Sequence, residues 1–170
     1  MTVHPIPPVF DENSRVLILG SFPSVKSREN AFFYGHPQNR FWRVLSAIFD
    51  APLPTSIDEK RSLLLESGIA VWDVIASCDI MGSSDSSIKN VCPNDITSIL
   101  EKACISAIFV NGKTAEKYYK KYIEHIVKRT AICLPSTSPA NAAVGLDELV
   151  KRWSVIREYT DIPSSPSTYI

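Results

Sequence analysis

The sequence predicts an α/β protein: a single-domain three-layer sandwich in which a central, mostly parallel four-stranded sheet is flanked by helices. Short apolar runs alternate along the chain with stretches whose apolar residues recur at helical spacing, and this alternation is typical of a parallel sheet with crossover helices. The chain has 170 residues, 45% of them hydrophobic, which suffices for one sizeable core. We therefore expect one domain over residues 1–170, with the Pro-, Ser- and Thr-rich ends, residues 1–13 and 161–170, peripheral.

The first predicted strand is the apolar run of residues 15–19. The loop that follows, residues 20–39, is rich in Pro, Asn, Gly and aromatic residues and much longer than the usual connection of about 4–6 residues. A helix from about residue 40 is predicted by apolar residues at positions i, i+3, i+4 and i+7: Phe41, Val44, Leu45 and Ile48. A second helix, residues 58–67, ends at Gly68.

Three further strands are predicted from apolar runs bounded by turn residues: residues 69–77, 106–111 and 130–134. Three further helices alternate with them: residues 96–102, 112–125 and 146–159. Right-handed crossovers place the loop after every strand at one edge of the sheet, which is where ligands bind in such folds. Four loops should therefore converge: residues 20–39, 77–93, 111–114 and 135–143.

The composition excludes several classes of protein. Lys and Arg total 18 and Asp and Glu total 18, so no global positive field indicates nucleic acid. Any contact with a polyanion must be local, and the available charges are Lys26, Arg28, Lys89 and Lys113. The 4 cysteines form no CxxC pair and no His completes a zinc motif, so we expect neither a metal nor an organic cofactor. No apolar run approaches the roughly 20 residues of a membrane span, and we expect a soluble, cytoplasmic, monomeric protein without a membrane partner.

Gly112, Lys113 and Thr114 copy the end of a phosphate-binding P-loop. The full motif needs a glycine five residues before Gly112, but position 107 is Ala within an apolar strand, so no glycine-rich cradle can form. Nucleoside triphosphate binding is therefore not expected. The helix that begins here can still meet a DNA phosphate through its free N–H groups.

Several polar residues of these loops have a structural and a functional interpretation. Asn39 either caps the following helix or orients a water molecule in a pocket. Tyr34 either joins the core or offers its ring to a planar base, and His36 is either a packed turn residue or a group at the pocket edge. Asp73, a carboxylate inside an apolar run, needs a partner; it either caps a neighbouring backbone or accepts a hydrogen bond from a ligand N–H.

Three segments together resemble the uracil-DNA glycosylase superfamily, and most of all its hypoxanthine-DNA glycosylase branch. They occur in the same order as in that family: GSFPS at residues 20–24, YGHPQNRFW at residues 34–42 and LPSTSPAN at residues 134–141. The uracil-specific branch has an Asp in the first turn and a His in the last loop, and neither is present here. The mismatch-specific branch has an Asn in the first turn, where this chain has Phe22.

The resemblance implies a monofunctional hydrolase that removes hypoxanthine from deoxyinosine in DNA after flipping the base out of the duplex. In that branch the essential amide is the Asn that matches Asn39, which we expect to hold the attacking water. Tyr34 lies at the family's stacking position, and Asp73 is our candidate to accept the N1–H of hypoxanthine. The remaining candidates form the pocket wall beside the base or contact DNA: Ser21, Phe22, Ser136, Ser138 and Asn141.

Two alternatives remain open at this point. A glycosylase for another damaged base, such as uracil or xanthine, would keep the pocket and change the base. A non-catalytic module that binds damaged or single-stranded DNA would keep Tyr34 and the basic residues, and it would have no need for Asn39.

Overall fold

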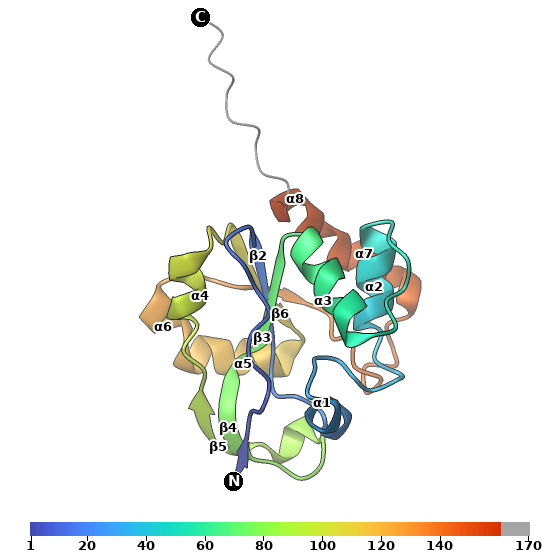
Figure 1. Cartoon of the computed structure of the whole chain (residues 1–170). Helices are drawn as coiled ribbons and strands as arrows, with labels where there is room; N and C mark the ends of the chain where they lie inside the picture. The colour runs from blue at the N-terminus through green and yellow to red at the C-terminus, as the bar shows by residue number, and fades with distance from the viewer. Residues whose placement is uncertain (161–170) are drawn as a thin grey trace, which may run out of the picture.

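The computed structural model describes residues 1–160 and is built around a four-stranded sheet with the strand order β3-β2-β6-β7 (Figure 1). The strands of this sheet are Val16–Gly20 (β2), Ile69–Asp73 (β3), Ala107–Asn111 (β6) and Ile132–Leu134 (β7). Each neighbouring pair is parallel, so the C-terminal ends of all four strands lie along one edge. The predicted α/β class and parallel sheet are confirmed.

Helices cover both faces of this sheet because the side chains of β2 alternate between two cores (Figure 1). Val16 and Ile18 pack in one core with the helices Phe41–Ile48 (α2), Ile57–Glu66 (α3) and Leu146–Trp153 (α7). Leu17 and Leu19 pack in the other core with the helices Thr97–Lys102 (α4) and Lys113–Tyr122 (α5). These two helical layers with the sheet between them form the predicted three-layer sandwich.

The ends of several helices differ from the expected ones. The segment expected as one helix over residues 112–125 is divided into α5 and Glu124–Val127 (α6). The segment expected over residues 146–159 is divided into α7, the 3-10 turn Ser154–Ile156 (η2) and Arg157–Thr160 (α8). The expectation for residues 161–170 lies outside the described part of the chain.

The strand expected over residues 69–77 is wrong in one respect, because it breaks at Val74 into β3 and Ile75–Asp79 (β4). The side-chain amide of Asn94 donates to the backbone oxygens of Asp73 and Ile75, at 2.9 and 3.3 Å, and so satisfies both sides of the break.

After the break, β4 belongs to a second, antiparallel sheet with the order β1-β4-β5. Its other strands are Thr2–Val3 (β1) and Lys89–Pro93 (β5). The loop expected over residues 77–93 therefore contains the end of β4, the 3-10 turn Asp85–Ser87 (η1) and the strand β5.

The N-terminal segment, residues 1–13, is not peripheral as expected. Its prolines do exclude a helix, but the extended chain that results pairs with the rest of the protein. Ile6 and Val9 are each 3% exposed, and Val9 exchanges both backbone hydrogen bonds with Val71 of β3. Apolar side chains between prolines thus complete one core, and the segment is part of the fold.

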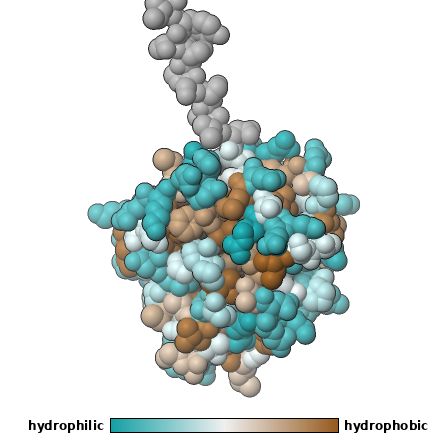
Figure 2. Space-filling view, in the orientation of Figure 1, coloured by the Kyte–Doolittle hydropathy of each residue, from teal (hydrophilic) through white to brown (hydrophobic). Residues whose placement is uncertain are grey.

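The surface mixes residue types. Figure 2 shows hydrophilic residues spread over most of one face, with apolar residues in small separate areas. Within residues 1–160, no helix combines the length and the apolar character that a membrane crossing requires. In the same range, no three His, Cys, Asp or Glu residues gather closely enough to hold a metal ion.

Candidate active site

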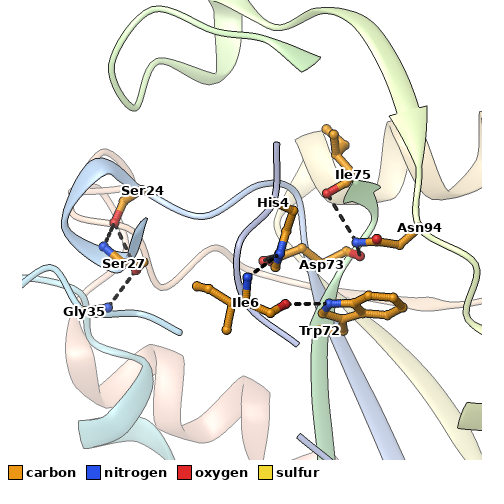
Figure 3. Close-up of polar contacts among 9 residues, drawn as sticks. All are labelled: His4, Ile6, Ser24, Ser27, Gly35, Trp72, Asp73, Ile75 and Asn94. Atoms are coloured by element: carbon orange, nitrogen blue, oxygen red, sulfur yellow. Dashed lines mark hydrogen bonds and ion pairs between the residues drawn. The ribbon is translucent and has the colours of Figure 1, made fainter. Parts of the chain in front are cut away.

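The long loop after β2 is ordered by a short helix that the sequence did not predict, Val25–Asn30 (α1). Ser24 caps this helix by accepting a hydrogen bond from the N–H of Ser27 at 3.1 Å. The buried hydroxyl of Ser27 then accepts from the N–H of Gly35 at 2.9 Å, which ties the second half of the loop to the helix (Figure 3). Two adjacent segments of the loop are thereby held in a defined position.

A pocket of about 550 Å³ opens where the C-terminal ends of the parallel strands meet these loops. All four loops expected to converge contribute residues to it. Seven of the eight residues selected from the sequence lie on its wall: Ser21, Phe22, Tyr34, Asn39, Asp73, Ser136 and Ser138. The eighth, Asn141, lines a neighbouring pocket of about 840 Å³ and donates its amide to the backbone oxygen of Ser136 at 3.0 Å.

Asn39 stands two residues before the first residue of α2, and part of its side chain helps to start that helix. Its Oδ1 accepts a hydrogen bond from the N–H of Phe41 at 2.9 Å, which satisfies one of the free donors at the helix start. This contact fixes which end of the amide is oxygen. Oδ1 retains a second lone pair, and Nδ2 donates to no group among residues 1–160, so both stay available on the pocket wall.

Tyr34 stacks on Phe41, with ring centroids 3.9 Å apart and planes at 22°. Its backbone has a φ of 52°, in the left-handed region that a residue with a Cβ rarely adopts, and the indole N–H of Trp42 donates to its carbonyl oxygen at 3.2 Å. Its Oη is buried near the side chain of Asn111, but it forms no well-aligned hydrogen bond with any described residue. Burial, together with the negative charge of Asp73, raises the pKa of Tyr34 well above its ordinary value, so the phenol is protonated.

Asp73 ends β3, and its side chain is only 5% exposed. Its Oδ2 lies 2.7 Å from Nε2 of His4, which comes from the N-terminal segment and is itself 3% exposed. Within residues 1–160, Oδ1 accepts no hydrogen bond. The buried carboxylate therefore has the partner that its burial requires on one oxygen, while the other faces the end of β2.

The last loop of the pocket is attached from two sides. Asn111, at the end of β6, exchanges two hydrogen bonds with the buried Thr137, at 3.0 and 3.1 Å. Arg40, beside Asn39, donates its backbone N–H to the oxygen of Thr137 at 3.1 Å. Its guanidinium donates to three carbonyl oxygens farther along the loop, those of Ser138, Asn141 and Val144.

Comparison with known proteins identifies the family. The model of the family "Uracil DNA glycosylase superfamily" matches residues 7–157. The chain belongs to the uracil DNA glycosylase superfamily. The resemblance to its hypoxanthine-DNA glycosylase branch is confirmed as well, because the chain is 35% identical over 137 residues to a protein of Methanosarcina acetivorans named hypoxanthine DNA glycosylase. That alignment covers 79% of this chain and 85% of the relative.

A protein of Methanosarcina barkeri with the same name is 34% identical over 114 residues, which cover 66% of this chain and 72% of the relative. A solution NMR structure of a candidate uracil DNA glycosylase from M. acetivorans superimposes with a TM-score of 0.79 at 28% identity, over 94% of this chain and 99% of that one. The expected enzyme class, a DNA glycosylase that acts on DNA as a hydrolase, is confirmed by these relatives.

The basic residues of this glycosylase are only partly available for DNA. Lys26 lies 3.4 Å from Glu29, and Arg28 donates to the carbonyl oxygen of Gly82 at 2.7 Å while lying over the ring of Phe22. Lys89 and Lys113 are exposed, and Lys113 borders the second pocket at the start of α5. Arg28 therefore supports the loop of residues 80–88 against α1.

Three residues that shape this glycosylase pocket were not selected from the sequence: His4, Arg40 and Asn111. Asn111 had a usable signal, because like Asp73 it is a polar residue at the end of an apolar strand. Arg40 stands next to Asn39 inside a selected segment. His4 had only an indirect signal, namely that the buried Asp73 required a partner somewhere in the chain.

Proposed function

We propose that this glycosylase hydrolyses the bond between C1′ and N9 of deoxyinosine in DNA and releases hypoxanthine. The bond breaks with its electron pair leaving on the base, and water supplies a hydroxyl to C1′ and a proton to the departing base. The target nucleotide flips out of the duplex to reach the pocket, at a cost of a few kcal/mol that is lowest for mispaired bases. The enzyme acts as a monomer and as a monofunctional hydrolase.

One observation carries this proposal. A single pocket of about 550 Å³ is lined by an amide, an aromatic ring and a buried carboxylate, those of Asn39, Tyr34 and Asp73. Its volume lies in the range of small-molecule sites, about 300–1,000 Å³. These groups correspond to the needs of the reaction, which are an oriented water, a surface for the base, and an acceptor that distinguishes one base from another.

Asn39 orients the attacking water in this proposal. The hydrogen bond from Phe41 fixes the amide plane, so the second lone pair of Oδ1 has a defined direction. Glycosidic cleavage passes through an oxocarbenium-like state, which needs a well-placed water more than a strong base. An amide is suited to this role although it is a poor base.

Asp73 selects the base by accepting a hydrogen bond from N1–H of hypoxanthine. The oxygen that does not contact His4 faces Gly20 and the pocket, which supports this assignment. Adenine carries a lone pair instead of a proton at N1, so an ionised carboxylate repels it. Sites built around one such hydrogen bond reject the analogue that lacks it by about 10⁴–10⁵.

Tyr34 provides the surface on which the flipped base stacks, and Phe22 and Ser21 line the adjoining wall. Stacking of a base on an aromatic ring contributes about 1–3 kcal/mol. One face of the Tyr34 ring already packs on Phe41, so only the other face or the ring edge is available to a base. The stack on Phe41 keeps the ring in position before the base arrives.

The last loop contacts the DNA backbone in this proposal. Ser136 and Ser138 line the pocket with hydroxyls that can donate to phosphate. Asn141 approaches the space left by the flipped base, although its amide now bonds to Ser136 and must turn to do so. Charge adds little on this surface, so the affinity for DNA should be modest and should fall with salt.

Single-turnover release of free base from matched oligonucleotides with deoxyinosine, deoxyuridine or deoxyxanthosine tests the proposal. We expect release of hypoxanthine, and a rate about 10²–10³ lower in Asn39→Ala, by analogy with the loss of one preorganised polar contact. Uracil and xanthine are the informative competitors, because each also offers an N–H beside a carbonyl group. Preferential release of either one would change the assigned base and leave the pocket assignment intact.

Asn39→Ser is the matched control for Asn39→Ala. A serine hydroxyl can accept from the N–H two residues on as an Asn side chain does, although more weakly, so this variant keeps the contact with Phe41 and removes the amide. We expect Asn39→Ser to keep the melting temperature of the wild type and to lose activity as Asn39→Ala does. Retention of most activity by both variants would remove Asn39 from the mechanism. Binding to DNA without release of any base would support the non-catalytic module instead.

A further inference from the structure

The N-terminal segment lies beside the end of β3, where His4 contacts Asp73 (Figure 3). The backbone N–H of His4 donates to the oxygen of Ala76 at 2.7 Å, and the indole N–H of Trp72 donates to the oxygen of Ile6 at 3.1 Å. The imidazole ring packs edge-on against the rings of Phe22 and Trp72, at 5.9 and 6.3 Å between centroids. His4 is thus held on both sides within an aromatic environment.

These contacts determine which ring nitrogen of His4 carries the proton. Nδ1 lies 3.1 Å from the backbone N–H of Ile6, and since that group can only donate, Nδ1 must accept. An imidazole with an acceptor at Nδ1 is neutral and carries its hydrogen on Nε2. Nε2 therefore donates to Oδ2 of Asp73 at 2.7 Å, so that a neutral imidazole binds an ionised carboxylate.

The two oxygens of Asp73 consequently differ. Oδ2 is occupied by His4, and Oδ1 faces the Cα of Gly20 and the phenol of Tyr34. A carboxylate held by one oxygen cannot rotate freely in a site where its side chain is 5% exposed. A base that approaches the pocket wall meets an acceptor whose position is set by His4.

We propose that His4 is a positioning residue for base selection: it holds Oδ2 of Asp73 and thereby directs Oδ1 toward N1–H of the flipped base. This inference rests on the proposed role of Asp73 and extends it to a segment outside the pocket. His4 does not touch the substrate. Its effect is on the preference for hypoxanthine over adenine rather than on the placement of the water by Asn39.

A matched pair of variants separates positioning from packing. In the variant His4→Gln, the terminal amide nitrogen of the new side chain reaches the position of Nε2 and can still donate to Asp73. In the variant His4→Asn, the amide oxygen of the new side chain reaches the position of Nδ1 and can still accept from the N–H of Ile6, but the contact with Asp73 is lost. Both variants lose the ring and its aromatic contacts, so their melting temperatures should fall together.

The measurement is the ratio of kcat/KM for deoxyinosine to that for deoxyadenosine in otherwise identical oligonucleotides. We expect His4→Asn to lower this ratio by about 10- to 100-fold, the effect of one hydrogen bond to a charged group. His4→Gln should keep most of the wild-type ratio. Equal ratios in the two variants would overturn the inference, because a packing role alone affects both in the same way.

Asp73→Asn distinguishes failure of this inference from failure of the proposed function. Loss of the preference in Asp73→Asn with the preference kept in His4→Asn would overturn the role of His4 alone. An unchanged preference in Asp73→Asn would overturn base selection by Asp73 itself. Long-range ¹⁵N–¹H correlations of the His4 ring in the wild-type protein should show hydrogen on Nε2 only, and hydrogen on Nδ1 would contradict the assigned tautomer.

Discussion

Gly20 and Asp73 are paired in register across β2 and β3, and the Cα of Gly20 faces Oδ1 of Asp73 so closely that a Cβ on Gly20 would overlap that oxygen. The same Cβ would stand 3.1 Å from Oη of Tyr34. The carboxylate and the phenol thus meet over the one residue of this strand end that has no side chain. The absence of a Cβ creates the space that the carboxylate and the phenol occupy.

Gly20→Ala should therefore impair activity more than folding. The added methyl group must displace the carboxylate, and overpacking of this kind costs about 1–3 kcal/mol. Because the displaced oxygen is the one that reads the base, we expect kcat/KM for deoxyinosine to fall about 10- to 100-fold, the effect of losing one hydrogen bond to a charged group. Gly145→Ala is the control, because no atom lies within 4 Å of the Cβ it would add. Equal activity of both variants would show that the carboxylate position is not critical.

Tyr34→Phe should leave stability unchanged or raise it. A buried hydroxyl without a partner costs about 1–3 kcal/mol, and Tyr34 Oη is such a group among the described residues. We expect the free energy of unfolding in urea to stay equal or to rise by about 1 kcal/mol. Tyr119→Phe is the matched control, since Tyr119 Oη donates to the oxygen of Arg129 at 2.6 Å and its loss should destabilise. A marked loss of stability in Tyr34→Phe would reveal a partner for that hydroxyl.

Alkaline pH should weaken the fold through Tyr119. Burial raises the pKa of Tyr119 from 10.0 to about 12, so the folded protein keeps a proton that the unfolded chain releases. The resulting stabilisation is complete below pH 10 and is lost as the pH rises through about 12. Unfolding free energies measured between these pH values should fall less steeply in Tyr119→Phe than in the wild type. Parallel curves would contradict the raised pKa.

Arg40→Ala should loosen the last loop without unfolding the protein. The guanidinium binds three carbonyl oxygens of that loop, whereas the contact of Asn111 with Thr137 would remain. Because hydrogen bonds to charged groups contribute about 1.5–3 kcal/mol, we expect faster hydrogen exchange in residues 136–144 and about tenfold weaker binding to an abasic duplex. Arg40→Lys should rescue little, since an ammonium group cannot reproduce the planar fork.

Arg43→Ala serves as the control for the Arg40 variants. It removes an exposed arginine three positions along, within α2. The charge change is the same, so any difference between the two alanine variants reports the contacts of Arg40 with the loop. Identical exchange and binding in Arg40→Ala and Arg43→Ala would show that charge alone matters.

The elements predicted correctly were those whose signal is local. The apolar run of β2 and the helical spacing of Phe41, Val44 and Ile48 each follow from burial of neighbouring residues, which periodicity records. The parallel direction of the strands followed from general rules of chain crossover. These rules also located the pocket, because they bring the loops after parallel strands to one edge.

The features that were missed depend on contacts between distant parts of the chain. His4 and Asp73 are 69 residues apart in sequence, and no local pattern indicates that they meet. The break at Val74 depends on the amide of Asn94, which is 21 residues from Asp73 in the sequence. For Asn39, local sequence indicated both a helix cap and a site residue, and a single amide has room for both roles.

The N-terminal segment provides the last prediction, since its composition suggested a peripheral position and its burial places it in the core. Ile6→Ala should destabilise the protein by about 2–4 kcal/mol, because Ile6 is 3% exposed and its loss leaves a cavity between the segment and the sheet. Val3→Ala, at a position 67% exposed, should have almost no effect. The free energies of unfolding of the two variants are compared in urea. Equal stability would mean that the segment is only loosely attached, and His4 would then have no fixed position from which to hold Asp73.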